Sequence, residues 1–66
     1  MLEKVLQDLR DEGYDANVVN NVVHVSVEEF DLYRIFVDEK IRLHSVDTGR
    51  DLIFDNYNEF LYFLET

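Results

Sequence analysis

The sequence predicts a single α+β domain: an N-terminal helix, an antiparallel β-meander of four to five strands, and a C-terminal helix. Apolar residues recur every three to four positions near both ends of the chain, which is the period of a helix. Between these segments, short runs of alternating apolar and polar residues are separated by turn residues, as in antiparallel strands. A chain of 66 residues without a linker or repeat has the size of one domain, spanning 1–66.

The first segment is predicted to be an amphipathic helix that covers one face of the sheet. Its apolar residues follow the i, i+3, i+4, i+7 spacing and are Leu2, Val5, Leu6 and Leu9. Gly13 is expected to end the helix in a left-handed conformation, with Tyr14 close to Leu9. Lys4 and Asp8, four residues apart, are spaced for a weak ion pair.

The best-specified element is a hairpin from Tyr14 to Val27. Asn20 and Asn21 lie between two apolar runs, and Asn tolerates the positive φ that a two-residue hairpin turn needs. The resulting register pairs Val19 with Val22, Val18 with Val23, Asn17 with His24, Ala16 with Val25, Asp15 with Ser26 and Tyr14 with Val27. Since side chains alternate across a strand, this register gathers the apolar residues on one face: Tyr14, Ala16, Val18, Val23, Val25 and Val27.

The middle of the chain predicts two more strands. The segment 28–31 is expected to be a loop or a single helical turn. Alternation then predicts a strand up to Val37, and a three-residue turn over 38–40 that pairs Val37 with Ile41 and Ile35 with Leu43. This pairing continues the apolar face of the first hairpin.

The end of the chain predicts a short strand and a helix. Asp47-Thr48-Gly49 is expected to be a three-residue turn with Gly49 left-handed, followed by a strand from Arg50 to Phe54. Asn56 is expected to cap the last helix, with Glu59 completing a capping box. The apolar stripe of this helix is Tyr57, Phe60, Leu61 and Leu64, with Tyr62 well off it.

The second face of the predicted sheet is too apolar to be left in water. Its apolar residues are Val19, Val22, Leu32, Phe36 and Val46, with Leu52 or Phe54 depending on register. Three alternatives are open: the last helix covers this face, the face packs on a second copy in a homodimer, or a different protein binds it. Arg34, Arg42 and His44 share the face and are expected to form ion pairs with Asp and Glu of the covering helix or of a second copy, with a small anion site as the alternative.

Charge narrows the class of partner. Fifteen acidic and six basic residues give a net charge of −9, which argues against direct nucleic-acid binding and against anionic membranes, and favours proteins with a basic surface. There is no Cys, no apolar run long enough to span a membrane, and no signal-peptide pattern, so we expect a cytoplasmic protein.

No motif supports catalysis or a cofactor. Asp47-Thr48-Gly49 matches the catalytic tripeptide of aspartic proteases, but that chemistry needs two aspartates and a larger fold. His24 and His44 lie on different predicted strands without the further ligands of a zinc site. We therefore expect a protein that is not an enzyme.

Three functional hypotheses follow. The first is a non-enzymatic, acidic protein-binding module, an inhibitor or nucleic-acid mimic that docks on a basic, nucleic-acid-handling protein. In size, charge and element order the chain is similar to small acidic inhibitors carried by phages and mobile elements, although no motif carries the similarity. Its expected partner-binding residues are Asp11, Glu12, Asp15, Glu28, Glu29 and Asp31.

The second hypothesis is a homo-oligomeric structural or accessory protein that buries its second sheet face. The residues expected at that self-association surface are Arg34, Phe36, Arg42 and Val46. The third hypothesis is a small metal- or anion-binding regulator that uses His24 and His44.

Overall fold

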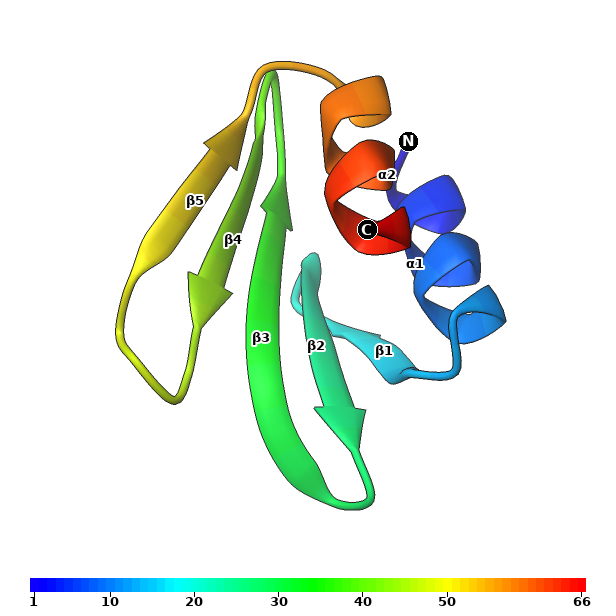
Figure 1. Ribbon diagram of the computed structural model, residues 1–66, viewed down its shortest axis with the longest axis vertical. Helices are drawn as coiled ribbons and strands as arrows, with labels where there is room; N and C mark the ends of the chain where they lie inside the picture. Colours follow the sequence, from blue (N-terminus) through cyan, green and yellow to red (C-terminus); the bar gives the residue numbers. More distant parts are fainter.

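The computed structural model describes residues 1–66 and contains two helices and five strands (Figure 1). The elements in chain order are α1 (Leu2–Asp11), β1 (Asp15–Val19), β2 (Val22–Val27), β3 (Phe30–Val37), β4 (Ile41–Ser45), β5 (Asp51–Phe54) and α2 (Tyr57–Glu65). The predicted α+β class and helix–meander–helix order are confirmed. The strands form one antiparallel sheet in the order β1-β2-β3-β4-β5, so each strand pairs with its neighbours in sequence.

The registers across the β1–β2 and β3–β4 turns follow the prediction. All five pairs of β1 with β2 match those predicted from the Asn20-Asn21 turn, and both Asn residues have positive φ, at 51° and 65°. Likewise, Val37 pairs with Ile41 and Ile35 with Leu43 across a three-residue turn.

Both helices cover the same face of the sheet. The ten buried residues form one cluster, with Val5 and Leu9 from α1, Phe60 from α2 and the rest from the sheet: Ala16, Val23, Val25, Ile35, Ile41, Leu43 and Phe54. Figure 1 shows α1 and α2 side by side, and Lys4 Nζ of α1 lies 5.7 Å from the centre of the Tyr57 ring of α2. Of the three alternatives for the second face, coverage by the last helix is therefore wrong. No element of this chain covers that face.

The end of α1 has the predicted geometry. Gly13 has a φ of 93°, and the Tyr14 N–H donates to Leu9 O at 3.0 Å, which satisfies a carbonyl of the last helical turn. The expected ion pair of Lys4 with Asp8 does not form, because the ammonium group lies over Tyr57 instead.

The segment 28–31 forms no helical turn, and its connecting part is shorter than expected because β3 already begins at Phe30. Val27 pairs with Phe30, so Glu28 and Glu29 alone form the β2–β3 turn, with φ values of 50° and 72°. The pairing then skips Leu32, so that Ser26 faces Asp31 and Val25 faces Tyr33. This β-bulge brings the acidic side chain of Asp31 to the face of Ser26.

The turn before β5 is one residue longer than predicted, and this changes the register. The N–H of Gly49 donates to Ser45 O and the N–H of Ser45 donates to Arg50 O, both at 2.8 Å, so the turn spans 46–49. A shift of one residue moves every side chain of a strand to the other face. Ile53 therefore lies on the second face, and the expectation that Leu52 or Phe54 would lie there is wrong.

The α2 helix explains this register. Phe54 is 9% exposed and packs edge-on against Phe60, with the ring centroids 5.7 Å apart. The helix begins where predicted, since Asn56 Oδ1 accepts from the Glu59 N–H at 2.9 Å. Tyr62 is 73% exposed, as expected for a residue off the apolar stripe.

Candidate protein-binding surface

The face of the sheet opposite the helices, here called the open face, carries three cross-strand rows of side chains. Residues that pair across neighbouring strands point to the same face, so the register defines each row. The row nearest the β3–β4 turn is mainly apolar and crosses all five strands: Val19, Val22, Phe36, Arg42 and Ile53. The guanidinium carbon of Arg42 lies 4.2 Å from the centre of the Phe36 ring, so Arg42 covers that ring from solvent.

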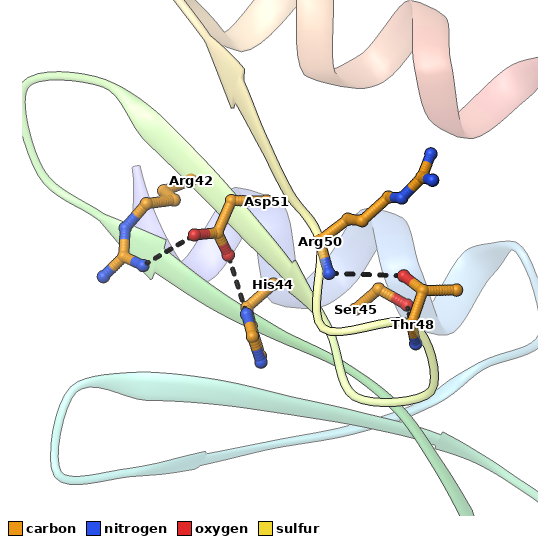
Figure 2. Close-up of polar contacts among 6 residues, drawn as sticks. All are labelled: Arg42, His44, Ser45, Thr48, Arg50 and Asp51. Carbon is orange, nitrogen blue, oxygen red and sulfur yellow. Dashed lines mark hydrogen bonds and ion pairs between the residues drawn. The ribbon is translucent and has the colours of Figure 1, made fainter.

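The middle row is polar and contains both histidines: Asn17, His24, Arg34, His44 and Asp51. Figure 2 shows Asp51 of β5 between Arg42 and His44 of β4. Asp51 lies 2.7 Å from His44 Nδ1 and 3.8 Å from Arg42 Nη1. All three side chains are at least 37% exposed, so we expect each pair to contribute less than about 1 kcal/mol.

This arrangement bears on the expected ion pairs of Arg34, Arg42 and His44. Arg42 and His44 pair with Asp51 of the neighbouring strand, not with a covering element, and Arg34 forms no ion pair. The pairing of Asp51 with His44 was not predicted, because a three-residue turn over 47–49 would place Asp51 on the helix-covered face. Asp51 already occupies the space between Arg42 and His44, which weakens the alternative of an anion site there.

The third row lies at the far end of the open face and is acidic, with Ser26 between Asp15 and Asp31. Two more carboxylates, Glu28 and Glu29, form the adjoining β2–β3 turn. The remaining two predicted residues, Asp11 and Glu12, end α1 four and three residues before β1 begins.

The six predicted partner-binding residues thus come from neighbouring parts of the fold: the end of α1 and the start of β1, on the lower right of Figure 1, and the β2–β3 turn with the start of β3, at its bottom. We call this set the acidic end: Asp11, Glu12, Asp15, Glu28, Glu29 and Asp31. All six are exposed, and none forms an ion pair. Arg10 is the nearby base, but its guanidinium donates to Ala16 O at 2.8 and 3.2 Å. Arg10 therefore forms no direct ion pair with any of the six carboxylates.

The turn at the acidic end has an unfavourable sequence for its shape. Glu28 and Glu29 adopt the same pair of positive φ angles as Asn20 and Asn21 at the other end of β2. Asn tolerates this conformation, whereas an ordinary side chain loses about 1–2 kcal/mol in it. The chain therefore keeps two glutamates at a position where stability alone favours Asn or Gly.

The structure places the predicted self-association residues at two locations. Arg34, Phe36 and Arg42 lie together in the middle of the open face. Val46 lies in the β4–β5 turn, where its N–H donates to Leu32 O at 2.9 Å, one step beyond the end of β4. Ile53, which the sequence analysis missed, is 62% exposed and completes the apolar row.

Three observations concern other classes of site. His24 and His44 share the middle row with Arg34 between them. No group of three or more His, Cys, Asp or Glu side chains is placed to hold a metal ion, so the regulator hypothesis gains no support from the geometry. Neither helix combines the length and apolar character needed to cross a membrane.

Comparisons with protein families, with curated proteins and with solved structures found no match to this chain.

Proposed function

We propose that this chain is a non-enzymatic protein-binding module of the cytoplasm that docks through its acidic end on a basic, nucleic-acid-handling protein. It acts there as an inhibitor or nucleic-acid mimic. The observation that carries the proposal is the grouping of six exposed carboxylates, none of them in an ion pair, from the end of α1, β1, the β2–β3 turn and the start of β3. Proteins that bind nucleic acid present Lys and Arg to phosphates, and carboxylates can occupy the same positions through charge-assisted hydrogen bonds.

The β2–β3 turn gives further support. Strained backbone conformations persist where they serve a function, because selection for stability alone would remove them. Glu28 and Glu29 carry both the strain and the charge, and the bulge adds Asp31 beside them. These three residues form the centre of the proposed contact.

The test is capture of the partner from an extract of the native host, followed by a salt titration of the retained protein. Since exposed charge pairs are screened by salt, the partner should be released as ionic strength rises. Added nucleic acid should compete with the chain for the retained protein. Glu28→Lys with Glu29→Lys should abolish capture.

The β3–β4 turn provides a matched control. Asp38 and Glu39 are also adjacent, exposed acids in a turn, at the opposite end of β3. Asp38→Lys with Glu39→Lys changes the net charge by the same amount and should leave capture unchanged. Capture that survives reversal at Glu28 and Glu29, or that both double variants weaken equally, would contradict the proposal.

A second candidate function is supported by the uncovered apolar row. A homo-oligomeric accessory protein would bury Phe36, Val22 and Ile53 of the open face against a second copy. Because this burial is mainly apolar, salt should affect it little, whereas a partner bound at the acidic end should be released.

A further inference from the structure

The β5 strand lies at an edge of the sheet but has the composition of an interior strand. It pairs with β4 alone, and Figure 1 shows nothing beyond its outer side. Leu52 and Phe54 point to the helix-covered face, and Ile53 points to the open face. Leu52 and Ile53 are 45% and 62% exposed. Strands with apolar side chains on both faces are usually flanked by strands on both sides, whereas edge strands usually carry charges that prevent further pairing.

The opposite edge of the sheet is protected. In the β1–β2 hairpin the two-residue turn makes Val19 and Val22 a hydrogen-bonded pair, so alternation directs the carbonyl of Ala16 outward. The Arg10 guanidinium donates two hydrogen bonds to that carbonyl. This side chain occupies an acceptor that another strand would need, and β5 has no equivalent protection.

The backbone groups of β5 that are free for pairing follow from the ladder with β4. The hydrogen bond from the Ser45 N–H to Arg50 O marks a hydrogen-bonded pair, and such pairs recur at every second residue. Leu52 is therefore hydrogen-bonded to β4, whereas the N–H and C=O groups of Asp51 and Ile53 point outward. A strand that pairs with β5 has to use these two residues.

We propose that β5 pairs antiparallel with β5 of a second copy of this chain, about a two-fold axis at Leu52. The outward N–H and C=O groups of Asp51 then form hydrogen bonds with those of Ile53 in the other copy. The outward groups of Ile53 do the same with Asp51 of the other copy. Leu52 lies directly opposite Leu52 of the other copy, so two exposed leucines form a cross-strand pair on the axis. The two sheets join into one sheet of ten strands.

Charge selects this register among the symmetric ones. Moving the axis to Asp51 places two aspartates directly opposite each other. Moving it to Ile53 places Asp51 opposite Asp55. Like charges directly opposite each other destabilise a strand pair, so among these three axes only the one at Leu52 avoids such contacts. An axis at Phe54 would pair Ile53 with Asp55, whose N–H already donates to Glu59 Oε1. This self-complementarity is the reason to assign the edge to a second copy and not to an unrelated strand.

Such an assembly ends at two copies. A two-fold interface uses the same surface on both partners, so it closes once formed. The remaining edges of the joined sheet are the two β1 strands, which Arg10 protects. The pairing also differs from packing of the open face, because it leaves the half-buried side chains of Phe36 and Val22 as they are in one copy.

The first test is the molecular mass in solution, measured by light scattering over micromolar to millimolar protein. The mass should rise with concentration to twice the 7.9 kDa of one chain. Leu52→Lys places two ammonium groups opposite each other and should weaken dimerisation by about tenfold or more. Val19→Lys, a matched change at an exposed position of the open face on β1, should leave dimerisation unchanged. Circular dichroism should show that both variants are folded.

The second test uses the absence of cysteine from the chain. Opposed residues of a non-hydrogen-bonded pair have Cα atoms about 4.5 Å apart, which suits a disulfide, so Leu52→Cys should form a covalent dimer on mild oxidation. The two copies of Ile53→Cys would lie about 8 Å apart, from a rise of about 3.4 Å per residue and a strand spacing of about 4.8 Å, and should not cross-link.

A wild-type chain that stays monomeric at millimolar concentration would overturn the proposal. So would cross-linking of Ile53→Cys as fast as Leu52→Cys, or loss of the dimer in Val19→Lys but not in Leu52→Lys. These outcomes are independent of partner capture by the acidic end, because Leu52 lies on the other face and at the far edge of the sheet.

Discussion

Replacement of the Glu28-Glu29 turn by Asn-Gly should stabilise the protein. Both glutamates have positive φ, and Asn-Gly is the sequence that such a two-residue hairpin turn favours. Relief of left-handed strain at Glu29 is worth about 1–2 kcal/mol, of which the extra flexibility of Gly in the unfolded chain cancels about 0.5–1 kcal/mol. Asn at position 28 contributes a similar net gain. We expect the free energy of unfolding to rise by about 1–2 kcal/mol in total.

The assay is thermal and urea unfolding followed by far-UV circular dichroism. For a domain of this size, the expected gain corresponds to a rise in Tm of about 5–15 °C. Glu28→Gln with Glu29→Gln removes the same two charges but keeps the strained side chains, so it isolates the effect of repulsion within an acidic chain. A replacement Asn-Gly turn that melts no higher than this control would refute the strain argument. The reverse change, Asn20→Glu with Asn21→Glu, should lower Tm.

The remaining predictions concern the core and the cap of α2. Phe60 is fully buried, so Phe60→Ala should lower the free energy of unfolding by about 3–5 kcal/mol, and circular dichroism should show a largely unfolded chain. Tyr62 is 73% exposed, so Tyr62→Ala should change Tm little. Equal losses in these two variants would mean that α2 does not pack as described. Asn56→Ala removes the cap of α2 and should cost about 1 kcal/mol in urea unfolding, while Asn58→Ala, in the first turn and without a cap bond, should cost less.

The sequence by itself determined the local elements of this protein and the register of its first hairpin. Alternation of side chains and the preference of Asn for positive φ are local properties, so the pairs from Val19–Val22 to Asp15–Ser26 could be derived without a structure. The caps at Gly13 and Asn56 were predictable for the same reason.

The β2–β3 turn was missed because its sequence contradicts its conformation. Nothing in Glu28 or Glu29 favours positive φ, so the sequence indicated a loop or a single helical turn for these residues and not a two-residue hairpin turn. The pairing of β2 with β3 on both sides of the turn imposes the conformation. The same pairing, with its bulge at Leu32, brings Asp31 opposite Ser26 and assembles the acidic end from residues that the sequence could only name separately.

Only the tertiary structure decided the register of β5 and the side on which α2 packs. A turn of three or four residues is compatible with the sequence after Ser45, and the difference exchanges the two faces of the strand. Contact of Phe54 with Phe60 and Phe63 selects the longer turn, and the same contact holds α2 on the face already covered by α1. Packing of those three rings depends on segments that only folding brings together, so the sequence could not determine what covers the second face. In the structure, no element of the chain covers it.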